Sequence, residues 1–332
     1  TQANEARVER GHVLGQQVLR IALGVDSDEQ HLHAVGILAE GVHHAAQFGQ
    51  RGRAHIRAMR VAEEHHDDLA AKVRQRAALA GVVGQREILA EALRTGELDL
   101  AILLTEGFIS AAGKGLQAKI IKEYITSPLG WGIFTGWKSQ FHSVYNQLPK
   151  KYAISKFGSG SHIMAMIHAE QRGEKIKLGD LIEVKSIDGA IESLTKNETQ
   201  IFYWEKYTTK PFIENKTLRM IGDFSAPWSS FLIVASNDAI RIKRSAIDNV
   251  LQIIDEESKT FVSSAQTVPL LQQRFKMSEA DAYTWLHSTV WSSDYSVRLL
   301  GLENAKQALL KIGSVNAGLD VSEFCDEYVT LV

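Results

Sequence analysis

The sequence predicts an α/β protein with two lobes, each built on a mainly parallel sheet, and a helical C-terminal part. Three observations lead to this fold class. Beyond residue 86, apolar runs of strand length alternate with segments of helical periodicity. A polar turn, a buried strand and further polar groups occur in this order twice. The first 86 residues lack this pattern and predict an atypical helical or irregular segment, while the 332 residues are enough for two lobes with separate cores.

Residues 1–86 differ from the rest of the chain in composition. They contain ten Arg, one Lys, eight of the twelve His, one aromatic residue (Phe48) and no Pro. A core made mostly of Ala and Val buries little apolar area per residue, so we expect weak packing here. Such Arg- and His-rich sequence is also typical of GC-rich DNA translated in an unintended frame. The composition therefore leaves open whether this segment belongs to the fold or is foreign to it.

Two Glu-x-x-His units in this segment are candidate metal ligands. A spacing of three residues on a helix points a carboxylate and an imidazole at one metal ion, as in di-iron helix bundles. Such a bundle also needs two further Glu residues and a well-packed interior, and neither is evident in the sequence. A solvated segment without a metal is the alternative that we favour. The candidate ligands are Glu40, His43, Glu63 and His66.

Apolar runs and helical stripes define the elements after residue 86. A helical stripe from Ile88 to Leu93 ends near Gly96, a residue that suits the position after a helix. The predicted strands are Leu100–Leu104, Lys119–Ile125, Trp131–Thr135, Tyr152–Ser155, Leu181–Lys185, Ile201–Trp204 and Phe231–Ala235. The further predicted helices are Ser161–Arg172, Gly189–Thr195, Asp238–Phe261, Ser278–Trp291 and Leu302–Ile312. This alternation favours mainly parallel sheets with both faces covered.

Polar residues follow two of these strands, Leu100–Leu104 and Ile201–Trp204, and a similar polar turn precedes each. Strand ends in two facing lobes would form a cleft, where open α/β sheets bind ligands. Glu106 and Glu205, which follow the two strands, would hold a ligand amine or an aminopyrimidine edge there. The alternative is that Lys210 or another basic residue neutralises them in ion pairs at the surface. The candidate ligand-binding residues at these strand ends are Thr105, Glu106, Gly107 and Glu205.

A Gly-Ser loop lies between the strand that ends at Ser155 and the helix that follows. Its glycines permit tight turns, its hydroxyls donate hydrogen bonds, and the helix start carries N–H groups with a partial positive charge. This combination suits a carboxylate, sulfonate or phosphate, whereas the missing Gly-Lys-Ser/Thr ending argues against ATP. The alternatives are that Ser161 only caps the helix and that His162 packs or bonds at its N-terminus. The candidate residues are Gly158, Ser159, Gly160, Ser161 and His162.

Two tryptophans in predicted strands are candidates for stacking on a planar ligand. These are Trp131, in the strand that follows the Ser-Pro break, and Trp204, directly before Glu205. An indole ring presents a large flat surface to a heteroaromatic molecule. Tryptophans in such strands more often fill the core, which is the alternative for both residues.

Charge and composition exclude several classes of function. A net charge of −2 gives no electrostatic basis for nucleic acid binding, which needs clustered Lys and Arg. The single cysteine, Cys325, excludes an internal disulfide and a metal site made of cysteines alone. An apolar run of about 18 residues and a signal-peptide pattern are both missing. The chain as written therefore predicts a soluble cytoplasmic protein without membrane insertion; a native leader before Thr1 would predict the periplasm instead.

A series of short motifs, in order along the chain, resembles the type 2 periplasmic-binding-protein fold over about residues 88–300. The resemblance is greatest to the branch of sulfonate- and nitrate-receptor-like proteins and fungal thiamine-pyrimidine-synthase-like proteins, and within it to stand-alone fungal and bacterial proteins without an assigned ligand. The motifs are Ala92–Ile102, Thr105–Gly107, Ser127–Leu129, Phe157–Met164, Trp204–Glu205, Thr208–Pro211 and Pro227–Trp228.

The resemblance implies two lobes joined by two crossing segments, near Ser127–Ile133 and Gly222–Ser230. The family begins with a strand, a ligand-lining loop and a helix in lobe 1, and the N-terminal part of this chain supplies only one candidate strand, Leu19–Val25. The expected domains are residues 1–86 as the atypical segment, residues 87–126 with 230–332 as lobe 1, and residues 127–229 as lobe 2.

The same resemblance implies a substrate-binding protein, similar to those of ABC transporters, that closes two lobes on a small polar molecule. The molecule would be anionic or heteroaromatic, such as a sulfonate or a pyrimidine-like compound. The resemblance implies neither catalytic residues nor a cofactor, and it leaves room for an ABC transporter permease as partner. One alternative is an enzyme of thiamine-pyrimidine precursor metabolism in which Lys210 engages an aldehyde cofactor, although one cysteine cannot supply the iron-binding motif of the fungal pyrimidine synthases. A second alternative is a metal-binding helical module in residues 1–86.

Overall fold

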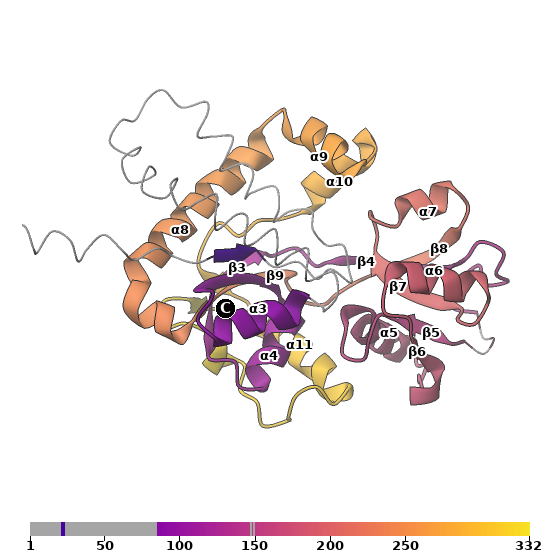
Figure 1. Ribbon diagram of the computed structural model, residues 1–332, viewed down its shortest axis with the longest axis horizontal. Coiled ribbons are helices and arrows are strands. Elements are labelled where there is room, and N and C mark those ends of the chain that lie inside the picture. The colour runs from indigo at the N-terminus through magenta and orange to yellow at the C-terminus, as the bar shows by residue number, and fades with distance from the viewer. Residues whose placement is uncertain (1–20, 24–84, 147, 149) are drawn as a thin grey trace, which may run out of the picture.

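The computed structural model describes residues 21–23, 85–146, 148 and 150–332, which form two lobes with a sheet in each (Figure 1). The lobe 1 strands are β1 (Ile21–Leu23), β2 (Leu100–Leu104), β3 (Ala118–Ile125) and β9 (Phe231–Ser236). The lobe 2 strands are β4 (Gly130–Gly136), β5 (Tyr152–Ile154), β6 (Leu181–Glu183), β7 (Ile201–Glu205) and β8 (Leu218–Ser225). Among the described strands, the order is β1-β2-β9-β3 in lobe 1 and β6-β5-β7-β4-β8 in lobe 2.

Helices cover both faces of the lobe 1 sheet. In β2, Leu100 and Ile102 join a cluster with the long helix α8, whereas Ala101 and Leu103 join a cluster with α3, α4 and α11. Every β2 residue is buried, so its uninterrupted apolar sequence follows from burial on both faces. The helices of this lobe are α3 (Gln85–Arg94), α4 (Thr105–Gly113), α8 (Asn237–Ser263), α9 (Thr267–Phe275), α10 (Glu279–Ser288) and α11 (Leu299–Lys311). A short parallel pair and a 3-10 turn complete it: β10 (Ser296–Val297), β11 (Thr330–Leu331) and Ser322–Phe324.

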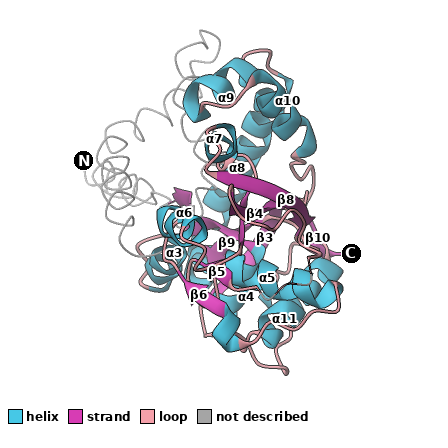
Figure 2. Cartoon of the chain, turned by 90° about the vertical axis from the view of Figure 1, so that its right-hand side faces the viewer, coloured by secondary structure: helices cyan, strands magenta, loops and turns pink. Residues whose placement is uncertain are grey.

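The lobe 2 sheet is covered in the same way. Ile201 and Tyr203 of β7 pack on the side of α5, and Phe202 and Trp204 pack on the side of α6 and α7. Figure 2 shows this lobe turned toward the viewer, with α5 and α6 on different sides of the strands. The helices are α5 (Gly160–Gln171), α6 (Ile187–Thr195) and α7 (Lys210–Glu214), with a 3-10 turn at Leu178–Asp180.

One strand in each sheet runs against all the other described strands: β9 in lobe 1 and β4 in lobe 2. Each of these two strands is entered directly from the other lobe, β4 through residues 126–129 and β9 through residues 226–230. A strand that begins at the sheet edge next to the crossing segments must run away from that edge. Its direction is therefore opposite to that of the strands that end there. All the other strands present their carboxyl ends to the crossing segments, and the sheets are otherwise parallel in direction, as predicted.

The two crossing segments are paired with each other. Ala226 N donates to Leu129 O at 3.2 Å, and Ser230 N donates to Ser127 O at 3.3 Å. The Ser230 hydroxyl donates to the same Ser127 carbonyl. Because backbone hydrogen bonds join them at both ends, the segments form one two-stranded connection between the lobes and not two independent linkers.

The structure confirms the fold class and most of the predicted elements. Within the candidate strand Leu19–Val25, the described residues Ile21–Leu23 form β1, which pairs in parallel with β2. The helix predicted over Ser278–Trp291 ends earlier, at Ser288, because Trp291 leaves it to form an antiparallel bridge with Ile125. The elements α4, α7, α9 and β8 were not predicted. None of the described helices combines the length and apolar character that a membrane span needs.

Candidate functional site

Strand ends from both lobes gather beside the crossing segments. In lobe 2, Trp131 at the start of β4 lies opposite Glu205 at the end of β7 and opposite Phe224 near the end of β8. In lobe 1, Phe231 at the start of β9 lies opposite Leu104 at the end of β2. The candidate residues that follow β2, β5 and β7 therefore lie along the two edges that flank the crossings. This is the position at which open α/β sheets bind ligands.

On the lobe 1 side, residues 105–107 form the first turn of α4. The Thr105 hydroxyl donates to the carbonyl of Ser229 at 2.5 Å, which joins the helix start to the second crossing segment. The Glu106 carboxylate is only 2% exposed and accepts a hydrogen bond from the indole N–H of Trp228 at 2.9 Å. The partial positive charge of the helix start stabilises this carboxylate. The partial positive charge at the start of α4 is therefore neutralised by Glu106, which lies in the first turn of this helix.

On the lobe 2 side, the Gly-Ser loop forms the start of α5, and its hydroxyls bond to each other and to the backbone. Ser159 is the N-cap, since its hydroxyl accepts from His162 N at 3.4 Å. Ser161 lies within the helix; its hydroxyl accepts from Ser155 N at 2.9 Å and lies 3.0 Å from the Ser159 hydroxyl. The capping role that the sequence assigned to Ser161 thus belongs to Ser159. No acidic residue lies in the first turn of α5, in contrast to α4.

His162 and the glycine before the cap fix the shape of this loop. Gly158 has a φ of +81°, a conformation that side chains other than glycine adopt only with strain. Its N–H donates to Nδ1 of His162 at 3.0 Å, so this nitrogen carries no proton. Burial lowers the pKa of His162, which favours the same neutral form. His162 therefore serves as an acceptor that holds the loop, with the ring of Phe157 edge-on at 5.5 Å.

The two candidate tryptophans are both fully buried but lie on opposite faces of the lobe 2 sheet. Trp131 belongs to the cluster beneath α5, which continues into lobe 1. Trp204 belongs to the cluster beneath α6 and α7, where its ring stacks on Phe202 at 4.9 Å. A single ligand could not contact both rings. Trp204 therefore fills the core, which was the alternative considered for both tryptophans. Of the two, only Trp131 lies on the face that continues toward lobe 1.

Glu205 organises the turn that follows β7. Its carboxylate accepts from the backbone N–H of Tyr207 at 2.9 Å and of Thr208 at 2.7 Å, and it is 5% exposed. These hydrogen bonds use much of the acceptor capacity of the Glu205 carboxylate within its own turn. Lys210 does not pair with it: the ammonium group lies 2.8 Å from the carboxylate of Asp281, in α10 of lobe 1. Glu106 and Glu205 thus both lie at the crossing edges, and both have protein partners.

Known proteins share the overall fold of this chain. A family model described as a Ca3427-like PBP matches residues 131–224. The CA3427 gene product of Candida albicans, described as having the generic periplasmic binding protein fold, superposes with a TM-score of 0.64 at 22% identity, over 74% of this chain and 85% of that chain. The alkanesulfonate-binding protein SsuA of Xanthomonas axonopodis pv. citri, bound to MOPS, gives a TM-score of 0.59 at 13% identity, over 74% of this chain and 84% of that one.

This chain has the type 2 periplasmic-binding-protein fold. The aliphatic sulphonate binding protein SsuA of Escherichia coli has the same architecture, with a TM-score of 0.56 at 17% identity over 74% of this chain and 81% of that one. No curated protein matches the chain. The resemblance read from the sequence is therefore confirmed at the level of the fold, and over most of lobe 2 the chain is similar to the Ca3427-like model.

In this periplasmic-binding-protein fold, the crossings hold an ion pair between a buried carboxylate and a half-exposed arginine, which the sequence did not reveal. Glu123, near the end of β3, is 2% exposed. It accepts from the guanidinium of Arg298 at 2.8 Å, from the Arg298 backbone N–H at 2.8 Å and from the Ser229 hydroxyl at 3.0 Å. The guanidinium also donates to the carbonyl of Thr126 at 3.2 Å. One carboxylate therefore holds both crossing segments against the residues that lead into α11.

A network of buried polar side chains lies beneath α5. The side chains of Lys150 and Arg172, 6% and 4% exposed, contact the carboxylate of Glu174 at 2.8 and 3.0 Å. Although burial acts to raise it, the pKa of Glu174 is lowered to about 2 by its hydrogen bonds with Arg172 and Lys150. His168 bonds to the hydroxyl of Tyr203 at 2.9 Å. Burial, and then the charge of Arg172, lower the pKa of His168 to about 4, so this histidine is neutral near pH 7.

Metal binding finds no support in the described part of the chain, where no three His, Cys, Asp or Glu side chains are grouped to hold an ion. The metal candidates Glu40, His43, Glu63 and His66 lie outside the described residues.

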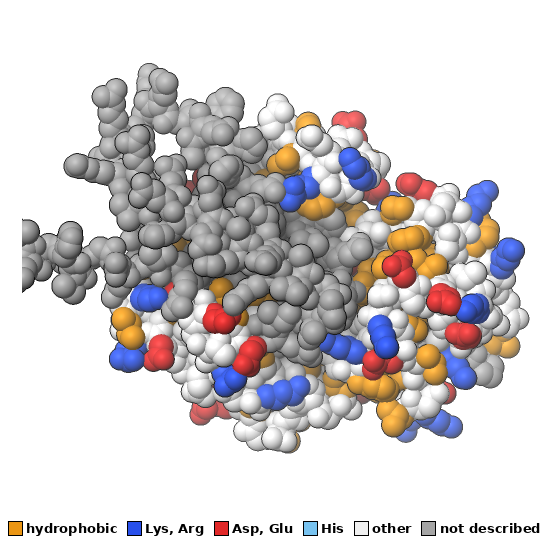
Figure 3. All heavy atoms as spheres, viewed as in Figure 1, with side chains coloured by type: hydrophobic (Ala, Val, Ile, Leu, Met, Phe, Trp, Pro, Cys, Tyr) orange, Lys and Arg blue, Asp and Glu red, His pale blue; other side chains and the backbone are white. Residues whose placement is uncertain are grey.

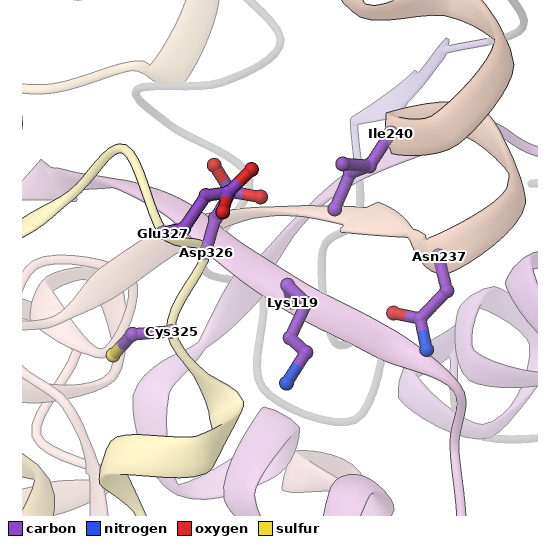
Figure 4. Close-up of a pocket in the computed structure, with 6 residues that line it drawn as sticks. All are labelled: Lys119, Asn237, Ile240, Cys325, Asp326 and Glu327. Carbon is purple, nitrogen blue, oxygen red and sulfur yellow. The ribbon is translucent and has the colours of Figure 1, made fainter.

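A separate hollow of about 320 Å³ lies at the opposite edge of the lobe 1 sheet (Figure 4). Figure 4 shows Lys119 and Asn237 on one side of it and the carboxylates of Asp326 and Glu327 on the other. Burial raises the pKa of the Cys325 thiol to about 11, so the thiol stays protonated and unreactive. Because Lys119 is near the start of β3 and Asn237 follows the end of β9, this hollow is remote from the crossings. Its lining residues are Lys119, Asn237, Ile240, Cys325, Asp326 and Glu327.

Proposed function

We propose that the protein is a solute-binding protein that closes its two lobes around a small polar, anionic molecule. The observation that carries this proposal is the position of the two helix starts. The first turn of α4 and the Gly-Ser start of α5 follow strands that end at the crossing edges of the two lobes. A molecule held between these edges would contact both lobes at once. Its binding energy would then favour the closed arrangement.

The anionic group is assigned to the lobe 2 side because the two helix starts differ in charge. The first turn of α4 contains the buried carboxylate of Glu106, which would repel an anion. The first turn of α5 contains hydroxyls and no acid. A helix start with serine hydroxyls and no acidic side chain favours a carboxylate, sulfonate or phosphonate group. The Glu106 side would instead suit a hydrogen-bond donor, such as an amine, at the other end of the ligand.

Sulfonates are the first class to test, because two similar structures are described as sulfonate-binding proteins and one contains MOPS. The described surface in Figure 3 carries Lys and Arg interspersed with Asp and Glu, so no broad positive field attracts anions on this face. Recognition would then depend on the short-range hydrogen bonds at the start of α5. A pyrimidine-like ligand, the other class implied by the resemblance, would use the ring of Trp131. An ABC transporter permease stays a predicted partner.

A thermal-shift screen of the full chain tests the proposal. The panel would hold MOPS, taurine, methylphosphonate, sulfate, an aminopyrimidine and adenine. A ligand at about 100 times its dissociation constant stabilises a protein by about 2.7 kcal/mol, which raises the melting temperature by several degrees. We expect such a rise with at least one sulfonate. No shift with any compound, at concentrations up to solubility, would contradict the proposed function.

A variant in the Gly-Ser loop tests whether the ligand binds at the start of α5. Ser159→Ala removes the N-cap hydroxyl of α5, and we expect the ligand-induced shift to fall by more than half. Ser236→Ala removes the equivalent N-cap hydroxyl of α8, which accepts from Ala239 N after the end of β9, at the edge of the lobe 1 sheet that is remote from the crossings. This control variant should lose similar helix stability, about 1 kcal/mol, and keep the full ligand-induced shift.

A further inference from the structure

The helix pair α9–α10 has a small core of its own, attached to lobe 1. Leu271, Ala282 and Leu286 are buried between the two helices. The pair is fixed to the end of α8 by aromatic contacts of Trp291, whose ring lies 5.9 Å from Phe261. Trp291 also bridges to the end of β3, as described above. The α9–α10 pair therefore moves with lobe 1.

This helix pair also reaches lobe 2. Figures 1 and 2 both place α7 of lobe 2 beside α9 and α10. The contact is the ion pair of Lys210, the first residue of α7, with Asp281 in the first turn of α10, at 2.8 Å. The two side chains are 37% and 19% exposed, so water screens the pair only in part. Although burial acts to raise it, the pKa of Asp281 is lowered by hydrogen bonds with Lys210 and Ser278.

The ion pair is connected to the proposed ligand site through one short turn. Glu205, at the crossing edge, accepts from the N–H groups of Tyr207 and Thr208. Thr209 donates its hydroxyl to the Glu205 carbonyl at 3.0 Å, and α7 starts at the next residue. Glu205 and Lys210 are therefore linked through the hydrogen bonds of this turn.

A second ion pair between the lobes lies on the side of α11 and is weaker. Lys311 of α11 contacts Glu170 of α5, and their side chains are 46% and 56% exposed. An ion pair between two exposed side chains contributes little. The Lys210–Asp281 pair is the better-shielded of these two contacts.

We propose that α9–α10 is a strap between the lobes, fastened by the Lys210–Asp281 ion pair, which favours the closed arrangement before any ligand binds. The inference rests on the proposed function, because it assumes lobes that open and close. The strap lowers the cost of closing on a ligand. It also makes closure sensitive to ionic strength, since added salt weakens a partly exposed ion pair.

Spin-label distances in the full, ligand-free chain test the strap. Nitroxides at Arg241→Cys in lobe 1 and Glu183→Cys in lobe 2, with Cys325→Ser, report the separation of the lobes. We expect Lys210→Met to raise the ratio of long to short distances by roughly 1.5- to 5-fold, the factor that matches the strength of a partly exposed ion pair. Lys210→Arg keeps the charge and should restore the wild-type distances.

The matched control is Lys196→Met, which removes an ion pair within α6, to Glu192, and should leave the distances unchanged. Salt at about 1 M, where the screening length falls to about 3 Å, should lengthen the distances of the wild type and have little effect on Lys210→Met. Identical distance distributions for wild type and Lys210→Met would overturn the strap, even if ligands bind. Longer distances in Lys210→Met together with a silent ligand screen would instead count against the proposed function alone.

Discussion

At the crossings, a single carboxylate depends on a single arginine. Glu123 is buried, and Arg298 is the cation that contacts it, although the arginine side chain itself is 48% exposed. Removing the arginine would leave a buried carboxylate with only hydroxyl and backbone partners. Losing the partner of a buried charge costs more than losing a surface ion pair.

We therefore expect Arg298→Met to lower the free energy of unfolding by about 1.5–3 kcal/mol. Arg241→Met is the control, because Arg241 pairs with Asp238 at the surface, with side chains 70% and 84% exposed. This control should change the free energy of unfolding by less than about 0.5 kcal/mol. Urea unfolding followed by circular dichroism measures both, and equal effects of the two variants would contradict the role of Arg298.

A pH effect is expected from His168. Its ring stacks on Phe224 at 4.7 Å and bonds to the Tyr203 hydroxyl, and the pKa is lowered to about 4, first by burial and then by Arg172. The unfolded chain binds this proton near the ordinary pKa of about 6.5. The contribution of neutral His168 to stability is therefore complete above pH 6.5 and is lost as the pH falls from 6.5 to 4.

The measurement is the urea midpoint at pH 7 and pH 5. The wild type should lose more stability on this change than His168→Gln, which has no titrating ring. Glu174 does not confuse the comparison, because its pKa of about 2 and its ordinary value both lie below pH 5. Equal losses in the two proteins would contradict the lowered pKa of His168 in the folded state.

Among single residues, those of the candidate site were predictable where a local pattern marks them. The Gly-Ser loop was found because glycines and serines between a strand and a helix have a known local conformation. The partnership of Glu123 with Arg298 spans 175 positions in the chain, and no local pattern relates the two. The face on which Trp131 or Trp204 lies depends on strand register, which a fully apolar strand does not reveal.

At the scale of elements, β4 shows how strands and side chains constrain each other. Gly132 lies opposite Trp204 in β7. A Cβ at this position would lie 2.2 Å from the ring of Phe134, which occupies the space above the glycine. Gly132 and Phe134 of β4 and Trp204 of β7 lie on one face of the sheet, and the Phe134 ring fits there only because Gly132 has no side chain.

We expect Gly132→Ala to destabilise lobe 2 by about 1–3 kcal/mol, the usual cost of overpacking. Gly130→Ala, two residues earlier in the same strand, is the control, since a Cβ there has no other atom within 4 Å. It should have a small effect on the melting temperature. A similar loss in both variants would mean that strand conformation, and not the Phe134 ring, sets the requirement for glycine.

Elements with long apolar runs were predictable, and short or half-exposed elements were not. Strands such as β2 and β9 are buried on both faces and appear as uninterrupted apolar sequence. Strand β8 is only partly buried along most of its length and contains a register shift against β4, so its sequence carries no clear period. Helix α4 begins directly at the strand end with Thr-Glu-Gly, which resembles a loop more than a helix.

For the whole molecule, the topology explains why the strand ends meet. The chain leaves lobe 1 at the end of β3 and returns to it at the start of β9, so both crossings pass along the same edge of each sheet. The other described strands of these two sheets all run in the opposite direction to β4 and β9 and end at this edge. The sequence implied two lobes through its resemblance to a known fold, but the reversal of β4 and β9 follows from the crossings themselves.

Hydrogen–deuterium exchange of the full chain, with and without the panel compound that gives the largest thermal shift, tests most directly whether ligand binds between the lobes. We predict slower exchange on binding at the starts of α4 and α5, residues 105–109 and 158–163, and in the crossing segments 126–129 and 226–230. Protection confined to the remote hollow lined by Lys119, Asn237 and Cys325 would contradict a site between the lobes.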